Sequence, residues 1–168
     1  MKKEESNFAY IDGANLHKGI EELGWNLDYA RFRVWLKDKY HISKAYLFIG
    51  LIPKNQLLYK YLQEVGFTLV FKETTYYSNG KAKGNCDAEL VLNAVSDFYE
   101  NKFDNAFLVT GDGDFSCLAT FLLGKSKLGF IIAPNRRKCS YLLRRIQARV
   151  AYLDGLRHKI GHKRKSPQ

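Results

Sequence analysis

Short apolar runs alternate along the chain with longer stretches whose apolar residues recur at helical spacing. The apolar runs predict β-strands, because they are continuous, short and bounded by turn-forming or polar residues. The longer stretches predict amphipathic helices with one apolar face. The predicted strands are Phe8–Ile11, Lys44–Gly50, Thr68–Lys72, Asn105–Thr110 and Leu128–Ala133. The predicted helices are Tyr29–Tyr40, Asn55–Val65, Asp87–Asn101, Phe115–Leu123 and Cys139–Leu153.

Strands that alternate with helices are typical of βαβ units, which build a mostly parallel sheet with helices on both faces. The sequence contains no internal repeat and no clear linker, so it predicts a single α/β domain, a three-layer sandwich with five strands. Right-handed crossovers bring the carboxyl ends of such strands to one edge of the sheet. From Arg157 onward the chain is basic and predicts fraying or disorder, so we expect residues 156–168 to form a flexible basic tail.

Four aspartates lie where predicted strands end or where a predicted helix begins. Asp12 follows the first strand, whereas Asp112 and Asp114 follow the fourth strand in the glycine-rich segment 110–115. Asp87 begins a helix on the stripe that faces the sheet, where a carboxylate is costly unless it is paired or bound to a metal. Ligands of open parallel sheets bind at the carboxyl ends of the strands. Because clustered carboxylates repel one another unless a cation neutralises them, the sequence predicts a Mg²⁺ or Mn²⁺ site.

Each aspartate also has a purely structural interpretation. An Asp-Gly pair after a strand often forms a turn, which would account for Asp12. An acidic residue in the first turn can cap a helix or interact favourably with the helix dipole, which would account for Asp87 and Asp114. Capping does not explain why Asp112 and Asp114 occur together between glycines, so this segment carries the strongest functional signal. No zinc, P-loop or Ser/His/Asp pattern competes with it in the sequence.

Composition limits the class of protein. The three cysteines, Cys86, Cys117 and Cys139, form no CxxC pair and are typical of a reducing compartment rather than of disulfides. No apolar stretch approaches the ~18 residues of a membrane span. The first seven residues are charged and contain no apolar core of a signal peptide. We therefore expect a cytoplasmic protein that does not enter a membrane.

The positive charge is concentrated at one end of the chain. The formal net charge is +10, and residues 136–168 carry 11 of the 27 lysines and arginines but only one of the 17 acidic residues. Such asymmetry favours a polyanionic partner such as a nucleic acid, although a solvated basic face is the simpler alternative. Charge alone does not distinguish RNA from DNA.

Three segments together resemble the NYN domains, the LabA-like branch of the PIN-like nuclease superfamily. They are Ile11–Leu16, Lys83–Asp87 and Thr110–Phe115, which occur in the same order and with similar spacing. The resemblance covers about residues 7–155. It implies a parallel sheet with strand order 3-2-1-4-5 and a metal-dependent endoribonuclease that acts on RNA.

Carried over position by position, the resemblance assigns the acidic cluster and its supports. Asp12, Asp87, Asp112 and Asp114 would be both the catalytic residues and the ligands of one or two Mg²⁺ or Mn²⁺ ions. Asn15 and Thr110 would be polar supports at the rim of the cluster. The family often has a further acid about six residues after the middle aspartate, where this chain has Asn93. That departure weakens the expectation of a full catalytic site.

Basic and aromatic residues predict contacts to the nucleic acid. Aromatic side chains beside lysines suit single-stranded RNA, although an ordinary hairpin with exposed tyrosines explains the same residues. Arginines on one face of the last predicted helix would contact backbone phosphates. The predicted contact residues are Tyr76, Tyr77, Lys81, Lys83, Arg136, Arg137, Lys138, Arg144, Arg145 and Arg149. A homo-oligomer is compatible with the sequence but nothing in the sequence requires one.

Two other functions stay open at this stage. A haloacid-dehalogenase-like phosphatase also has a strand-end aspartate and a later Gly-Asp motif, but its usual Asp-x-Asp segment is broken here by Ala14. A non-catalytic RNA-binding or regulatory module with a vestigial acidic pocket is the stronger alternative. Such a module would bind RNA without a metal.

Overall fold

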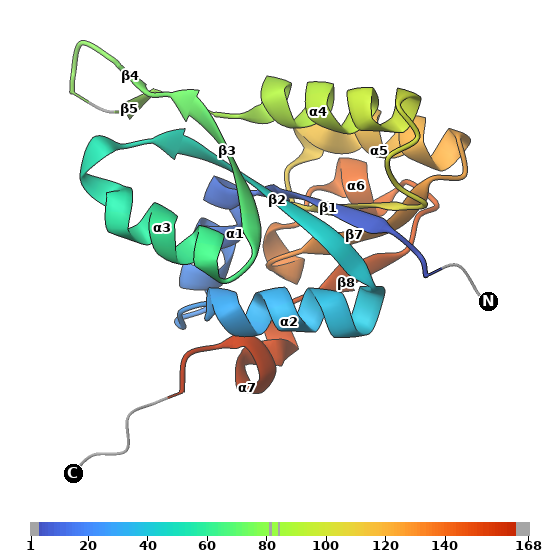
Figure 1. Cartoon of the computed structure of the whole chain (residues 1–168), viewed down its shortest axis with the longest axis horizontal. Helices are drawn as coiled ribbons and strands as arrows, with labels where there is room; N and C mark the ends of the chain where they lie inside the picture. Colours follow the sequence, from blue (N-terminus) through green and yellow to red (C-terminus); the bar gives the residue numbers. More distant parts are fainter. Residues whose placement is uncertain (1–3, 81, 84, 164–168) are drawn as a thin grey trace.

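The computed structural model describes residues 4–80, 82–83 and 85–163. Six parallel strands form one sheet in the order β3-β2-β1-β6-β7-β8. Helices cover both faces of this sheet, and a separate antiparallel hairpin, β4–β5, projects from the body of the molecule (Figure 1). The strands are β1 Asn7–Asp12, β2 Ile42–Leu51, β3 Phe67–Glu73, β4 Thr75–Tyr76, β5 Ala82–Lys83, β6 Ala106–Val109, β7 Leu128–Ala133 and β8 Val150–Tyr152.

Seven α-helices and four short 3-10 helices connect the strands of the described chain. The α-helices are α1 Gly13–Glu21, α2 Tyr29–Tyr40, α3 Gln56–Glu64, α4 Asp87–Tyr99, α5 Ser116–Gly124, α6 Tyr141–Arg144 and α7 Arg157–Ile160. The 3-10 helices are η1 Pro53–Asn55, η2 Gly113–Phe115, η3 Arg136–Lys138 and η4 Asp154–Leu156. None of the helices in the described ranges is both long enough and apolar enough to cross a membrane.

The alternation of side chains along β1 divides the core into two layers. Ala9 and Ile11 pack with apolar residues of α1, α2, α3 and α7 on one face of the sheet. Phe8 and Tyr10 pack with residues of α4, α5 and α6 on the other face. Successive side chains of a strand point to opposite faces, so a central strand that is covered on both sides is apolar throughout. The three-layer α/β fold is therefore confirmed.

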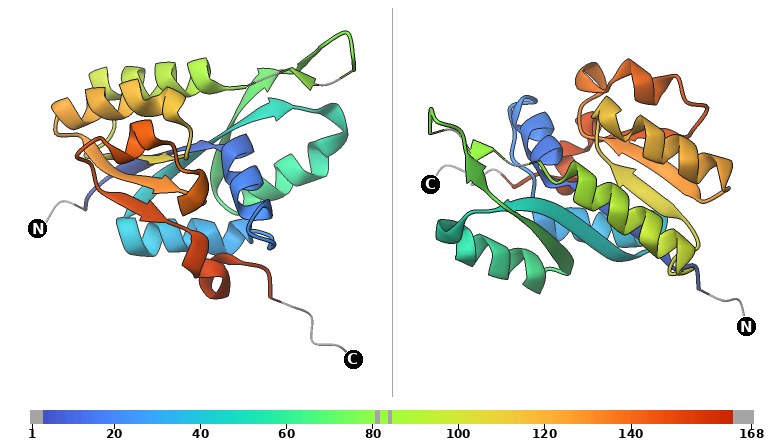
Figure 2. Two further views of the ribbon diagram at one scale, coloured as in Figure 1. Left: turned by 180° about the vertical axis from the view of Figure 1, so that it is seen from behind. Right: turned by 90° about the horizontal axis from the view of Figure 1, so that it is seen from above.

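The predicted strand order is confirmed, but the number of strands is corrected from five to six. The predicted strands correspond to β1, β2, β3, β6 and β7, and they lie in the predicted order 3-2-1-4-5. The additional strand, β8, lies beside β7 at the edge of the sheet (Figure 2). Its sequence falls within the segment Cys139–Leu153, which the apolar spacing had assigned to one long helix.

The prediction of that long helix is wrong, because only α6 is helical within it. After α6 the chain turns and pairs with the free edge of β7, where Ile131 lies opposite Val150. The amide of Ile131 donates a 2.9 Å hydrogen bond to the carbonyl oxygen of Arg149. An unpaired strand edge leaves backbone N–H and C=O groups without hydrogen-bond partners. Pairing of β8 with β7 satisfies these groups, and this gain outweighs the apolar spacing that would fit a helix.

The helix α1 was missed by the sequence analysis, which assigned only a turn after Asp12. Leu16 and Ile20 are buried and lie four residues apart, as expected for an amphipathic helix. Gly13 begins this helix close to β2, where a Cβ atom would lie only 2.8 Å from the carbonyl oxygen of Phe48. Gly13 therefore serves the close packing of α1 on the sheet.

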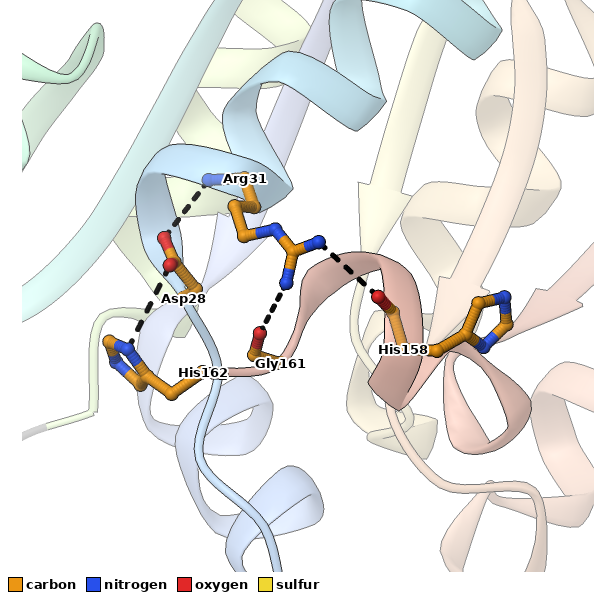
Figure 3. A network of polar contacts seen from close by, with 5 residues as sticks. All are labelled: Asp28, Arg31, His158, Gly161 and His162. Carbon is orange, nitrogen blue, oxygen red and sulfur yellow. Dashed lines mark hydrogen bonds and ion pairs between the residues drawn. The ribbon is translucent and has the colours of Figure 1, made fainter. Parts of the chain in front are cut away.

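The prediction of a flexible tail over residues 156–168 is wrong for its described part. The short helix α7 packs on α2, and Ile160 is fully buried between them and the sheet. Arg31 of α2 donates hydrogen bonds to the carbonyl oxygens of Gly161 and His158, at 2.8 and 3.3 Å (Figure 3). The buried side chain of Ile160 and the guanidinium of Arg31 together hold in place a segment whose basic composition predicted disorder. Residues 164–168 lie outside the described part of the chain.

Candidate functional site

Three of the predicted acidic residues come together at one edge of the sheet. Asp112 and Asp114 lie in the turn that follows β6, and Asp87 is the first residue of α4. Carboxylate oxygens of these three residues lie within 4.8 Å of one another. The chain positions them from two segments that are 25 residues apart in sequence, so neither segment by itself creates the cluster.

Asp12, at the end of β1, is not one of the three grouped carboxylates, but its charge interacts with those of Asp87 and Asp112. One carboxylate oxygen accepts a 3.2 Å hydrogen bond from the amide of Asn15 and so caps α1. The other oxygen accepts a 3.2 Å hydrogen bond from the hydroxyl of Thr110, which is buried at the end of β6. Asn15 in turn accepts a 2.7 Å hydrogen bond from the amide of Gly111. Asn15 and Thr110 therefore tie the first aspartate to the loop that carries the other two.

The loop after β6 is held by its own polar side chains. The amide of Asp112 donates to the hydroxyl oxygen of Thr110 at 3.1 Å, and the amide of Asp114 donates to the carboxylate of Asp112 at 2.9 Å. Asp112, rather than Asp114 as the sequence suggested, is thus the residue that caps the short helix η2. A Cβ atom on Gly113 would lie 3.0 Å from the Cβ of Ser140, so this glycine is explained by packing and not by access of a ligand.

The four aspartates form one electrostatic unit. Burial and the negative charges of Asp12, Asp112 and Asp114 raise the pKa of Asp87 to about 6. Burial also raises the pKa of Asp12, while the hydrogen bonds from Asn15 and Thr110 partly oppose the rise. A carboxylate whose neighbours are also carboxylates resists ionisation until a cation compensates the charge. Binding of a positively charged ligand should therefore relieve the repulsion among these carboxylates and lower the free energy of the site.

The donor atoms of the cluster fit a hard divalent cation. Carboxylate oxygens are the ligands that Mg²⁺ and Mn²⁺ prefer, whereas thiolates and imidazoles suit softer metals. The thiol nearest in sequence is that of Cys86, and burial and the charge of Glu89 raise its pKa to about 11. Without a metal ion this thiol is protonated at neutral pH, and it is not grouped with the three aspartates in the described part of the chain. Asp12, Asp87, Asp112 and Asp114 are the residues that could hold one ion or two.

The described contact residues predicted before Asp87 are Tyr76, Tyr77 and Lys83, in or next to the strands of the β4–β5 hairpin. Tyr76 and Tyr77 are exposed, at 62% and 52% of their possible surface. Lys83 lies in β5, and Lys81 lies outside the described residues. The hairpin leads within four residues into Asp87 at the start of α4. It is an antiparallel hairpin, as the simpler alternative predicted, and its exposed rings leave the binding interpretation open.

The arginines that follow β7 do not share one environment. The guanidinium of Arg136 lies 4.3 Å from the ring centre of Tyr152, and its backbone amide donates to Asp154. Arg137 donates its amide to the side chain of Asn135, which caps η3. Lys138, the last residue of η3, instead faces a pocket beside the aspartate cluster.

The predicted arginine face of the last helix does not exist. Arg144 ends α6, and Arg145 follows it as an exposed residue. Arg149 comes just before β8, and its guanidinium lies 4.6 Å from the ring centre of Phe130. Because the long helix is absent, these three side chains have no common helical face.

A single hydroxyl group links Asp12 to Asp112, so its removal should loosen the cluster. Thr110→Val keeps the volume but removes the donor to Asp12 and the acceptor for the amide of Asp112. Groups that orient metal ligands typically contribute 10- to 100-fold to affinity. We expect Mn²⁺ binding, measured by isothermal titration, to weaken about tenfold. Thr120→Val removes a hydroxyl that bonds only within α5 and should leave Mn²⁺ binding unchanged; equal effects of both variants would contradict the linking role.

The chain belongs to the NYN domain family, whose model matches residues 9–154. A solved structure of a protein of unknown function from Vibrio parahaemolyticus RIMD 2210633 is similar to nearly the whole chain. The two share 22% sequence identity with a TM-score of 0.76, over 96% of this chain and 99% of the other. At this identity the similarity supports the fold alone. No functionally curated protein matches the chain.

Proposed function

We propose that this protein is a divalent-metal-dependent endoribonuclease that hydrolyses phosphodiester bonds of RNA at its aspartate cluster. The observation that carries the proposal is the approach of the Asp87, Asp112 and Asp114 carboxylates to within 4.8 Å in a chain of the NYN family. Three acids at this separation are electrostatically costly without a cation. A catalytic metal site accounts for that cost.

The protein contributes orientation and charge to this chemistry. Asp12, Asp87, Asp112 and Asp114 would hold Mg²⁺ or Mn²⁺. When bound, such an ion supplies Lewis-acid stabilisation of the phosphate and lowers the pKa of a water molecule. Thr110 and Asn15 keep Asp12 and the loop after β6 in place, so the carboxylates need not reorganise when the substrate binds. No serine, cysteine or histidine is required as a nucleophile.

Single-stranded RNA is the substrate class that the surroundings of the cluster favour. The hairpin that leads into Asp87 carries the exposed rings of Tyr76 and Tyr77, on which unpaired bases could stack. The net charge of +10 supports attraction of a polyanion. The choice of RNA over DNA rests on the NYN family.

The direct test is to incubate the purified protein with labelled single-stranded RNA in the presence of Mn²⁺, Mg²⁺ or EDTA. We expect internal cleavage with either ion and none with EDTA. A double-stranded RNA and a generic phosphomonoester serve as specificity controls, and hydrolysis of the phosphomonoester would favour the phosphatase alternative. RNA that stays intact with every ion would reject the endoribonuclease.

A non-catalytic RNA-binding module is the second candidate, and one residue favours it. Asn93 stands where many family members have a further acid, and its side-chain oxygen is buried without a hydrogen-bond partner in the described part of the structure. The cluster therefore offers no fifth carboxylate at this position. RNA bound equally well with EDTA and with Mn²⁺, without cleavage, would support this module.

A further inference from the structure

A small polar pocket adjoins the aspartate cluster between α1 and the loop after β7. Its volume is about 210 Å³, which is several times the ≈ 30 Å³ that a water molecule occupies. The pocket is lined by Asn15, Lys18, Gly19, Glu22, Gly111, Pro134, Asn135 and Lys138.

Two residues belong both to the aspartate cluster and to the pocket. Asn15 binds the carboxylate of Asp12 through its amide, and its side chain binds Gly111, the residue before Asp112. A ligand in the pocket therefore contacts Asn15, which is hydrogen-bonded to Asp12, and Gly111, which is the residue before Asp112. A polymer bound at the cluster would reach this pocket with a neighbouring part of its chain.

The wall of the pocket is fixed by close packing. A Cβ atom on Gly19 would lie 2.7 Å from the Cβ of Pro134, so α1 approaches the loop as closely as a glycine permits. Asn135 is buried, and its side-chain oxygen accepts a 3.0 Å hydrogen bond from the amide of Arg137. These contacts hold Lys138 at a defined distance from α1. The pocket is a preformed part of the fold.

The charge of the pocket suits an anion. Lys18 and Lys138 are exposed, and neither forms an ion pair within the described residues. Glu22 is the one acidic residue of the lining, and it lies seven residues beyond Asn15, roughly 10 Å along the helix axis. With two lysines and one glutamate the lining carries one net positive charge, whereas the cluster itself is negative.

The opposite side of the cluster has a different character. A shallow groove between α4 and η2 is lined by Asp87 and Asp114 at the cluster and by the apolar side chains of Val91 and Val95 beyond it. No lysine or arginine lines this groove. Of these two hollows beside the cluster, only the pocket on the α1 side is lined by lysines.

We propose that the Lys18–Lys138 pocket binds the backbone phosphate next to the one that is cleaved, and so sets the direction of the single-stranded RNA across the site. This inference rests on the proposed function. Lysine binds phosphate as a point charge, and two ammonium groups on opposite walls match one phosphodiester. The metal cluster and the pocket would then contact two consecutive phosphates of one strand.

The test compares RNA binding by Lys18→Gln/Lys138→Gln with binding by Lys125→Gln, both in an Asp112→Asn background that keeps the RNA intact. Lys125 follows α5 and is exposed, away from the pocket lining. Each phosphate contact to a single strand contributes about 0.7 to the slope of log K against log salt concentration. We expect the double variant to lower this slope by about 0.7 and to weaken binding roughly tenfold at low salt. Lys125→Gln should leave the slope unchanged.

The outcome separates this inference from the nuclease proposal. Unchanged slopes in both variants would overturn the phosphate pocket, even if the wild-type protein cleaves RNA with Mn²⁺. A lower slope only in the double variant would support the pocket, even if no cleavage were seen. The melting temperatures of all variants should match, since the substituted side chains are exposed.

Discussion

Replacing Asp112 with asparagine is expected to reduce metal-dependent cleavage of single-stranded RNA by more than about 100-fold. Outer groups that only orient a metal ligand already contribute 10- to 100-fold, so loss of a ligand charge should exceed that range. Asp112 is the central residue of the cluster, since it lies with Asp87 and Asp114 and raises the pKa of both Asp12 and Asp87. Initial rates at saturating RNA and Mn²⁺ provide the measurement.

The asparagine variant also tests whether the effect is chemical or structural. Asparagine caps helices about as well as aspartate, so the hydrogen bond from the amide of Asp114 should survive. Loss of one charge from a repulsive cluster should not lower the melting temperature of the metal-free protein. Asp38→Asn, on the exposed surface of α2, is the matched control and should keep the wild-type rate. An Asp112→Asn protein with full activity would remove Asp112 from the proposed site.

Acidification is expected to weaken Mn²⁺ binding about 30-fold between pH 7.5 and pH 4.5. The pKa of Asp87 is raised from 3.8 to about 6, so this ligand is ionised at the higher pH and mostly protonated at the lower. Metal ligands must be deprotonated, and a proton with a pKa of about 6 competes roughly 30-fold at pH 4.5. Isothermal titration with Mn²⁺ at several pH values measures the effect directly. Affinity that does not change down to pH 4.5 would contradict the raised pKa.

The same pKa shift sets the pH dependence of stability. A folded-state pKa above the ordinary value means that the folded protein binds the proton more tightly than the unfolded chain. The metal-free protein should therefore lose stability as the pH rises from about 4 to about 6, and only slightly, because solvent screens the partly exposed carboxylate of Asp87. Mn²⁺ should reverse the trend above pH 6. Asp87→Asn should reduce both the loss and its reversal, with a remainder from the raised pKa of Asp12, whereas Asp38→Asn should retain them in full.

The sequence predicted five strands and their parallel pairing because the relevant patterns are local and strong, whereas the strand order was implied by the resemblance to the NYN domains. Continuous apolar runs such as Phe8–Ile11 mark strands that are covered on both faces, and the helices between them require parallel pairing. The correspondence of these runs to β1, β2, β3, β6 and β7 is confirmed. The predicted meeting of Asp87 with Asp112 and Asp114 follows from this topology, since the carboxyl ends of parallel strands share one edge.

The sequence failed where two structures of similar local preference compete. Residues after α6 have apolar spacing that fits a helix, but they include Val150 and Tyr152, which fit a strand. The residues form the strand β8 because they pair with the free edge of β7. A local apolar pattern does not indicate that such an edge is available. The packing of the last described residues likewise depends on Arg31 and on the core residues that bury Ile160, which are far away in sequence.

The resemblance to the NYN domains implied the strand order. By itself the sequence determined the α/β class, five strands of the sheet and the three segments that carry the acidic residues. These properties follow from the period of apolar residues and from turn chemistry, which act over a few neighbouring positions. Only the tertiary structure showed the sixth strand, the absence of the arginine face and the placement of Lys18 and Lys138 in the lining of one pocket. Each of these features depends on which distant segments pair with a free strand edge or pack against α1. Contacts between residues far apart in sequence produce no periodic pattern of apolar residues, so the sequence pattern does not predict them.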